Sequence, residues 1–191
     1  MPRGAPPPYR GSVTVRTVRT RDLPPDELAA LRSFLEEAWL DEPEGFSQED
    51  WEHALGGLHF VIEEDGRPVA HAAVVERQIQ IGGLALSAGY VEAVATAAER
   101  RRRGLASAVM LDVGRYIDRT FELGGLSSGR HAFYGRLGWR VWRGPAFVRL
   151  GGELVRTPDD DGSVLVRLTP LSPELDLTAP ISCDWRPGDA W

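Results

Sequence analysis

The sequence contains no lysine and no asparagine, and only one cysteine, Cys183, among its 191 residues. Without lysine, the chain lacks both the amine for Schiff-base catalysis and the lysine of a P-loop. A single cysteine excludes an intramolecular disulfide framework and any multi-cysteine zinc site. No stretch approaches the ~20 apolar residues that span a bilayer. We therefore expect a soluble, cytoplasmic protein that uses none of these chemistries.

The charge balance is acidic, because 28 acidic groups face 22 arginines and the net charge is −6. Nucleic-acid binding depends on neutralising phosphates with a basic face, so this balance disfavours a general nucleic-acid binder. The charges are also segregated. Residues 33–66 carry eleven acids and no arginine, residues 99–149 eleven arginines and four acids, and residues 150–191 eight acids and three arginines. This layout indicates either ordinary clustered surface charge or a site for one anionic and one strongly cationic molecule.

The chain has the size and composition of one folded domain. Its 191 residues fall within the roughly 100–200 residues typical of a domain, and 42% hydrophobic residues suffice for a core. Residues 1–11, rich in proline and arginine, read as a flexible leader without the apolar centre of a signal peptide. We expect a single domain over residues 12–191.

Hydrophobic periodicity and turn residues predict the elements of this domain. Strands are predicted over residues 12–20, 59–64, 69–80, 84–96, 123–128, 139–150 and 164–168. Helices are predicted from Pro25, after Ser47 as N-cap, and over residues 104–120 and 131–137. Asp65-Gly66 and Gly82-Gly83 are hairpin turns. The fold class is therefore mixed α/β (α+β), with an antiparallel meander followed by a strand–helix–strand unit.

An arginine-rich turn connects the strand 84–96 to the helix 104–120. Within it, residues 101–106 read Arg-x-x-Gly-x-Ala. Gly104 and Ala106 allow a ligand to approach the backbone, and the first amides of the helix lie at the positive end of its dipole. Such a turn is an anion cradle suited to a pyrophosphate. The alternatives are a solvated basic helix start and a nucleic-acid patch at residues 100–103.

The position of this turn after a strand resembles the acetyl-CoA site of the Gcn5-related N-acetyltransferase (GNAT) superfamily. The order strand–helix–helix–three strands–helix–strand–helix–strand also resembles that fold, over about residues 13–150. The resemblance implies a mixed central sheet flanked by helices, with acetyl-CoA as cosubstrate.

Several local strings resemble one subfamily, the aminoglycoside 2'-N-acetyltransferases. These are WEHALGGLH at 51–59, GYVEAV at 89–94, LSS at 126–128, GW at 138–139, RTPDDDG at 156–162 and CDWRPGDAW at 183–191. The last string is the most distinctive, because the general superfamily does not prescribe it. The subfamily resemblance implies a homodimer that acetylates polycationic aminoglycosides.

The resemblance assigns the acetyl-CoA side of the site. Backbone from Val94 to Thr96 would bind the pantetheine arm, and the Val94 amide would polarise the acetyl carbonyl. The pyrophosphate would be held by Arg101, Arg102, Arg103, Gly104, Leu105 and Ala106, and Ala95 lies within the same strand segment. Glu92 would be the base, through water, and Tyr134 would protonate the departing thiolate.

The resemblance also implies an acidic substrate site. Aminoglycoside ammonium and hydroxyl groups would be bound by Asp159, Asp160, Asp189 and the carboxylate of Trp191, with Ser127 and Ala93 lining the site. The subfamily places a substrate-binding aspartate directly before a phenylalanine, whereas Gly45 precedes Phe46 here. We expect a neighbouring acid, Asp41 or Glu44, with Glu42 also nearby, to substitute.

The chemistry can also be judged from the residues alone. Acyl transfer to an amine requires a base, a donor for the oxyanion and an acid for the leaving thiolate. Glu92 lies within the apolar run Val91–Val94, where desolvation would raise its pKa, unless it lies on the solvent face. Tyr134 could equally be an aromatic core residue. Cys183 is interpreted as a packed structural thiol.

No metal site is predicted. The four histidines, His53, His59, His71 and His131, are too scattered for a metal motif and are interpreted as structural or surface groups. The acids at 159–161 lack the spacing of an EF-hand. The sequence thus predicts an acetyl-CoA-dependent N-acetyltransferase acting directly, in a ternary complex, on the 2'-amino group of aminoglycosides. The alternatives are an acetyltransferase for another cationic amine or amino sugar, and a non-catalytic binder of aminoglycosides or CoA.

Overall fold

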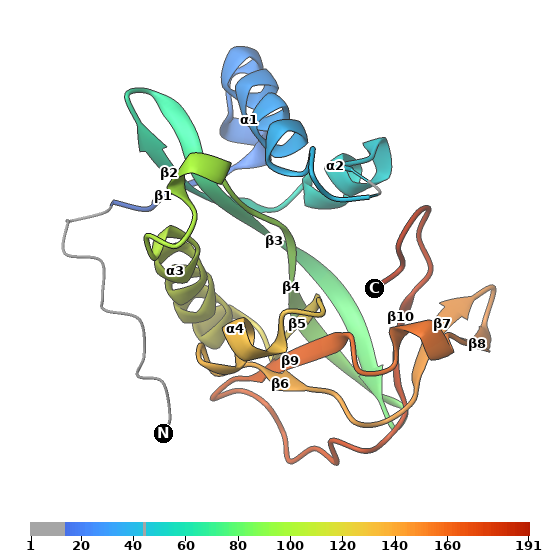
Figure 1. Cartoon of the computed structure of the whole chain (residues 1–191). Helices are drawn as coiled ribbons and strands as arrows, with labels where there is room; N and C mark the ends of the chain where they lie inside the picture. Colours follow the sequence, from blue (N-terminus) through green and yellow to red (C-terminus); the bar gives the residue numbers. More distant parts are fainter. Residues whose placement is uncertain (1–13, 44) are drawn as a thin grey trace.

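The computed structural model describes residues 14–43 and 45–191. The leader, the first residues of the strand predicted from residue 12, and Glu44 therefore lie outside the described residues. A mixed sheet forms the centre of the molecule, and its two longest strands, β3 and β4, run through the length of the molecule (Figure 1). The strands are β1 (Arg16–Arg19), β2 (Leu58–Glu64), β3 (Arg67–Ile81), β4 (Leu84–Thr96), β5 (Leu123–Ser127), β6 (Arg140–Val141), β7 (Ala146–Leu150), β8 (Glu153–Arg156), β9 (Val164–Leu168) and β10 (Ile181–Asp184).

The strand order is β6-β9-β5-β4-β3-β10-β7-β8, and β2 also pairs with β3 and with β1. One edge of β3 thus pairs with β2 through residues 67–74 and with β10 through residues 79–81. The predicted antiparallel meander is β2–β3–β4, and β4 and β5 are parallel, as the strand–helix–strand prediction requires. The sheet prediction is therefore confirmed at its centre.

Helices cover both faces of the sheet (Figure 1). They are α1 (Pro25–Ala38), α2 (Gln48–Ala54), α3 (Leu105–Thr120) and α4 (His131–Gly135), with short 3₁₀ turns η1 (Thr20–Asp22), η2 (Ala98–Arg100) and η3 (Pro158–Asp160). The apolar side of α3 packs on Ala70, Ala72 and Val74 of β3. On the opposite face, α1 and α2 bury Leu35 and Trp51 against β4. Burial on both faces explains the nearly continuous apolar run in β3.

The predicted turns and caps form as expected. Asp65 and Gly66 both have positive φ, 51° and 73°, as a two-residue type I′ hairpin requires. Ser47 caps α2, because its hydroxyl accepts from the Asp50 amide while the Asp50 carboxylate accepts from the Ser47 amide at 2.9 Å. These local signals fixed the helix and hairpin boundaries to within a few residues.

The strand predicted over 139–150 is wrong in its middle. It is divided into β6 and β7, with Trp142 to Pro145 between them. At Gly144 an added Cβ would lie 2.0 Å from the Ala179 carbonyl oxygen, so the chain here packs directly on another backbone segment and cannot pair as a strand. The strands β8 and β10, each only four residues long, were not predicted from the sequence. No helix within the described residues has the length and apolarity needed to cross a membrane.

Candidate active site

A cleft opens where β4 and β5 separate. The two strands pair only from Ala88 to Tyr90 on β4, opposite residues 123–125 of β5. Beyond Tyr90, β5 continues beside β9 while β4 runs on to Thr96 beside β3. The cavity between them has a volume of about 760 Å³ and is bounded by β4, β5, the start of α3 and α4. Glu92, Ala93, Val94, Ala95 and Thr96 all line it.

The arginine–glycine turn lies at one end of this cleft. Gly104 is the N-cap of α3 in a left-handed conformation, with φ 85°, and the first turn of the helix contains no acidic residue. Of the residues predicted to hold a pyrophosphate, Arg101, Arg102, Gly104, Leu105 and Ala106 line the cavity, and Arg100 lines it as well. Free helix amides beside guanidinium groups fit a pyrophosphate. This end of the cavity can therefore hold the phosphates of CoA.

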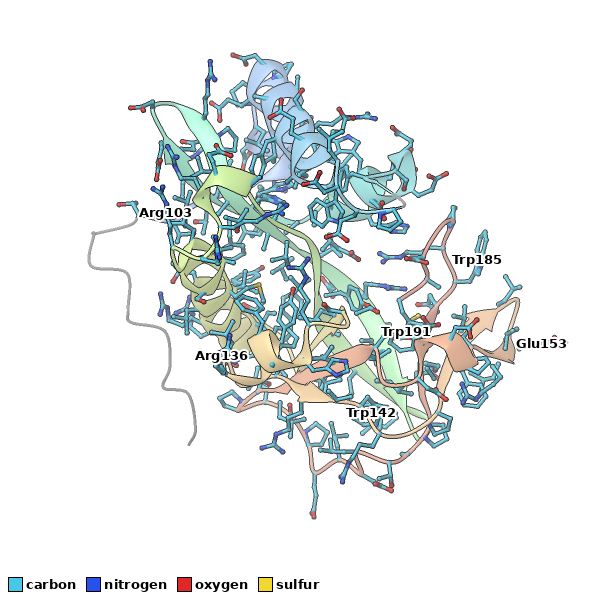
Figure 2. The ribbon with its side chains drawn as sticks, in the orientation of Figure 1. Arg103, Arg136, Trp142, Glu153, Trp185 and Trp191 are labelled. Carbon is cyan, nitrogen blue, oxygen red and sulfur yellow. The ribbon has the colours of Figure 1, made fainter. Side chains whose placement is uncertain are left out.

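The arginines of the turn differ in their contacts. Arg101 donates to the carbonyl oxygen of Ala38 at the end of α1 (2.9 Å), and Arg100 forms an ion pair with Glu64 (2.7 Å). These contacts fix the turn to the neighbouring elements. Arg103, labelled in Figure 2, is exposed and is not among the residues that line the cavity, so its predicted phosphate contact has no geometric support in this conformation.

Glu92 lies at the centre of the cleft and is largely shielded from solvent. Its side chain is 14% exposed and forms an ion pair with Arg186 of the C-terminal segment, at 2.7 Å between Oε1 and Nη1. Burial raises the pKa of Glu92, while the positive charges of Arg186 and Arg77 oppose the rise. Glu92 is therefore not on a solvent face, and its carboxyl group can accept a proton from a bound ammonium group.

Tyr134 reaches the same cavity from α4. The side chain is 5% exposed and contacts Phe133 and Trp139 edge-on, so it is at once a core aromatic residue and a lining residue. Burial raises the pKa of Tyr134 to about 12, although Arg130 and Ser128 act in the opposite direction. The phenol therefore remains protonated at neutral pH and can donate a proton.

A second, acidic cavity of about 350 Å³ adjoins the first. The two cavities share Trp39, Glu42, Glu92 and Ala93. Asp189, a predicted substrate residue, lines the second cavity, and Asp50 of α2, which was not among the predicted site residues, lines it as well. Acid side chains from three separate segments thus converge beside Glu92, which suits a ligand with several positive charges.

In the loop before α2, the structure places Glu42, rather than Asp41, beside the two cavities. Glu42 lines both cavities and forms an ion pair with Arg130 (3.1 Å), whereas Asp41 is exposed and lines neither. Glu44 lies outside the described residues. The expectation for Asp41 thus finds no support in this conformation. Local sequence could not separate Asp41 from Glu42, because the two are adjacent in a loop.

The other predicted substrate residues lie around the rim. Ser127 lines the first cavity and its hydroxyl donates to that of Ser163 (3.2 Å). Asp159 and Asp160 belong to η3 and line neither cavity, but burial and the negative charges of Asp189, Asp159 and Asp161 raise the pKa of Asp160. Asp160 is therefore electrostatically coupled to Asp189. Asp161 instead pairs with Arg156 and has a structural role.

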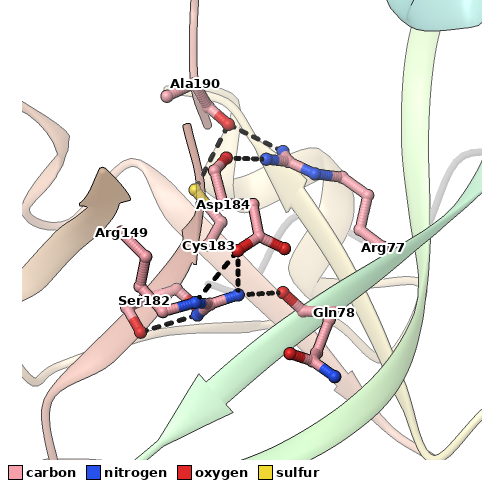
Figure 3. Close-up of polar contacts among 7 residues, drawn as sticks. All are labelled: Arg77, Gln78, Arg149, Ser182, Cys183, Asp184 and Ala190. Carbon is pink, nitrogen blue, oxygen red and sulfur yellow. Dashed lines mark hydrogen bonds and ion pairs between the residues drawn. The ribbon is translucent and has the colours of Figure 1, made fainter. Parts of the chain in front are cut away.

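The C-terminal segment is docked by several contacts rather than frayed. Arg77 of β3 donates to the carbonyl oxygens of Ala190 (2.7 Å) and Asp184 (2.8 Å), and the Cys183 thiol donates to Ala190 as well (Figure 3). Trp191 is 5% exposed and lines the first cavity, whereas Trp185 is 54% exposed at the outer edge (Figure 2). Cys183 is fully buried, and burial raises the pKa of its thiol, which fits the structural interpretation.

The part of the chain that the structure describes contains no candidate metal site. Within residues 14–43 and 45–191, no group of three or more His, Cys, Asp or Glu side chains is arranged to hold a metal ion. His53 Nε2 donates to the carbonyl oxygen of Pro187 (2.8 Å) and so contacts the C-terminal segment. His59 and His71 contact each other in the core.

A splayed β4–β5 pair with an anion cradle at the next helix defines an acetyltransferase of the GNAT class. Comparison with known proteins agrees. The family described as "Acetyltransferase (GNAT) domain" matches residues 19–142. An aminoglycoside 2'-N-acetyltransferase from Mycolicibacterium fortuitum is 43% identical over 190 residues, covering 96% of each chain. The chain belongs to the GNAT acetyltransferase family and, within it, to the aminoglycoside 2'-N-acetyltransferases, which confirms the membership predicted from the motif strings.

Solved structures support the fold. The GNAT family N-acetyltransferase YhbS from Escherichia coli, in complex with CoA, has a TM-score of 0.61 at 15% identity and covers 91% of both chains. A GNAT family acetyltransferase from Brucella melitensis, in complex with acetyl-CoA, has a TM-score of 0.54 at 19% identity and covers 68% of this chain and 84% of its own. At these identities the similarity is one of fold. Acetyl-CoA is the acetyl donor of this family, and the cradle described above fits it.

Proposed function

We propose that the protein transfers the acetyl group of acetyl-CoA to the 2'-amino group of aminoglycosides, by direct attack in a ternary complex. The observation that carries this proposal is the meeting of two oppositely charged cavities at Glu92 and Ala93. One has arginines and helix amides at its far end. The other is lined by Glu42, Asp50 and Asp189. A polyanionic donor and a polycationic acceptor would therefore meet at the proposed base.

The proposed proton transfers follow from this geometry. Only a neutral amine attacks the thioester, so Glu92 would take a proton from the bound ammonium group, through water. The nitrogen then attacks the acetyl carbon, and the Val94 amide would donate to the developing oxyanion. Collapse of the tetrahedral intermediate breaks the carbon–sulfur bond. Tyr134 would protonate the thiolate that leaves, and the acetylated amine loses its remaining proton to solvent.

Arg186 adds a condition to this scheme. Its guanidinium group lies 2.7 Å from the carboxylate of Glu92. A substrate ammonium group must therefore bind this carboxylate together with Arg186 or displace Arg186 from it. The ion pair stabilises the charged form of Glu92 and so opposes the rise in pKa that burial causes. The acids of the second cavity would then bind the remaining ammonium groups of the substrate.

We further propose a cytoplasmic homodimer. Acetyl-CoA is an intracellular metabolite, which supports a cytoplasmic location. The β7–β8 hairpin exposes Leu150, Leu154 and Val155, and Trp185 is exposed after the neighbouring strand β10. Apolar groups on an edge hairpin of this kind favour association with a second copy. Sedimentation velocity measures the oligomeric state directly.

The substrate proposal is tested with matched aminoglycosides that carry either an amino or a hydroxyl group at the 2' position. We expect CoA release with acetyl-CoA and the 2'-amino compound only, and mass spectrometry should show one added acetyl group at that nitrogen. No turnover with any 2'-amino compound would contradict the substrate assignment. A much higher kcat/KM for another cationic amine or amino sugar would assign the site to that substrate instead, and tight binding without product would indicate a non-catalytic binder.

A further inference from the structure

A bulge in β4 shapes the backbone at the centre of the cleft. His71 pairs with Ala95, and Ala73 pairs with Glu92, so one residue of β3 faces two residues of β4, Ala93 and Val94. Ala93 has φ 51°, a left-handed conformation that a non-glycine residue adopts at a cost of about 1 kcal/mol or more. A backbone held in this conformation needs a partner that fixes it, because the regular ladder is interrupted here.

That partner is a buried histidine. His71 Nδ1 lies 2.8 Å from the carbonyl oxygen of Ala93, and the His71 side chain is fully buried. The Ala93 carbonyl and the Val94 N–H belong to the same peptide group, which is planar and trans. The two bonds therefore point in opposite directions. Fixing the carbonyl toward His71 necessarily directs the Val94 N–H away from His71, and Val94 lines the cleft.

His71 is the last member of a longer hydrogen-bond chain. His59 Nδ1 lies 2.9 Å from His71 Nε2, and His59 Nε2 lies 2.8 Å from the Thr20 hydroxyl. Thr20 in turn accepts from the Gly56 amide at 3.0 Å. These contacts join η1, the turn after α2, β2, β3 and the bulge of β4 into one line through the core.

The carbonyl group of Ala93, at the end of this series of hydrogen bonds, determines which atom donates in each of them. A carbonyl only accepts, so His71 must donate from Nδ1 and accept at Nε2. His59 must then donate from Nδ1 and accept at Nε2, and the Thr20 hydroxyl must donate to it. Every ring nitrogen has one suitable partner in this arrangement, with both rings neutral. Burial supports the neutral state, because it lowers the pKa of His59 to about 4 and that of His71 to about 3.

We propose that His71, held in its Nδ1–H tautomer by His59, is a positioning residue that aims the Val94 amide at the acetyl carbonyl. This inference rests on the proposed function, which places the thioester at the open edge of β4. Neither histidine lines the two cavities described above. It fixes the orientation of one peptide group, and its effect on the reaction passes through that group alone.

The tautomers are tested first, in the unmodified protein. Long-range ¹H–¹⁵N correlation spectra at neutral pH should show a protonated Nδ1 and an unprotonated Nε2 for both His59 and His71. A cationic ring, or an Nε2–H tautomer at either position, would overturn the proposal. This measurement requires no variant and no turnover. It therefore stands even where the amine substrate has been assigned wrongly.

Two variants then separate positioning from folding. In His71→Asn the side-chain amide can occupy the place of Nδ1 and still donate to Ala93, whereas His71→Leu has no donor. We expect kcat to fall roughly 10- to 100-fold in His71→Leu, with little change in the KM for acetyl-CoA, and to recover largely in His71→Asn. Equal kcat values for folded His71→Leu and the wild type would overturn the proposal.

The Val94 amide gives a readout that does not depend on the amine. Adding acetyl-CoA should move its ¹H–¹⁵N resonance in the wild type and in His71→Asn, and should move it much less in His71→Leu at the same saturation. Should His71→Leu not fold, the pair His59→Asn and His59→Leu repeats the comparison one step further along the chain. The same shift in donor-retaining and donor-lacking variants contradicts the proposal, whereas absent aminoglycoside turnover contradicts only the proposed function.

Discussion

At the scale of single residues, Glu92 combines burial with a close positive partner. Burial raises its pKa and Arg186 opposes the rise, so the carboxylate is available as a base only above a pKa that is itself raised. A base must be unprotonated to act. The kcat/KM of the enzyme should therefore fall as the pH falls through the pKa of Glu92, which lies above the ordinary value for a glutamate.

Replacing Glu92 by Gln should lower kcat roughly 100-fold or more, the usual contribution of a positioned base. The dissociation constant of acetyl-CoA, measured by calorimetry, should change little, because the phosphates are bound at the other end of the cleft. The acid limb of the pH–rate profile should disappear as well. Glu76→Gln, at an exposed position of the neighbouring strand, serves as the control. An unchanged pH profile in Glu92→Gln would exclude the base role.

At the scale of elements, the parts with strong local signals were predictable. The helices α1 and α3 have apolar residues at helical spacing, and the two hairpin turns carry Asp-Gly and Gly-Gly pairs, so their positions followed from sequence. The break between β6 and β7 did not, because Gly144 packs on the distant Ala179. The short strands β8 and β10 likewise form only through pairing with segments far along the chain.

The site shows the same division. Residues inside motif strings, such as Val94 and Gly104, could be assigned to the cofactor side from the sequence, and they do line the cleft. The roles of Glu42, Asp50 and Arg186 could not be assigned, because each depends on how separate segments meet. The contact of His71 with the Ala93 carbonyl is also invisible in the sequence, since it requires the bulge register.

The C-terminal segment gives a prediction at this scale. Arg77 holds it through two backbone carbonyls, of Ala190 and Asp184. Arg77→Met keeps most of the side-chain volume and removes both hydrogen bonds. We expect the KM for the aminoglycoside to rise roughly tenfold, equivalent to about 1.4 kcal/mol, with an unchanged acetyl-CoA dissociation constant. Arg67→Met, an exposed position on the same strand, provides the control. If the KM for the aminoglycoside equals that of the wild type, the contacts of Arg77 with the C-terminal segment do not contribute to substrate binding.

At the scale of the whole molecule, the acidic and basic stretches of the sequence become two ends of one cleft. Acids from the loop before α2, from α2 and from the C-terminal segment line one cavity, and the arginine turn closes the other. The total charge of −6 carries no such information. Folding converts a segregation along the chain into a field across the site.

The buried histidines should also govern how the whole fold responds to acid. His59 and His71 have pKa values lowered to about 4 and about 3, whereas an unfolded histidine titrates near 6.5. Between these values the unfolded chain binds more protons than the native protein, so stability is complete above about pH 6.5 and falls as the pH drops toward 4. The loss should reach roughly 1.4 kcal/mol per pH unit for each histidine.

Urea unfolding at pH 7, 6 and 5 measures this slope. The variant His71→Asn, which lacks one titrating ring, should show a shallower dependence of the unfolding free energy on pH, whatever its stability at pH 7. His131→Gln removes an exposed histidine instead and serves as the control variant. Identical slopes in His71→Asn and the wild type would show that the pKa of His71 is not lowered in the native state.

The long strand β3 also limits how this protein can change. His71, which contacts the bulge, and Arg77, which holds the C-terminal segment, are six residues apart on one strand, so both side chains point to the same face of the sheet. Inserting or deleting a single residue between them would turn one of the two to the opposite face. Residues between His71 and Arg77 can therefore be substituted during evolution. A change in length of one residue, by contrast, would break in one step either the contact of His71 with Ala93 or that of Arg77 with the C-terminal segment.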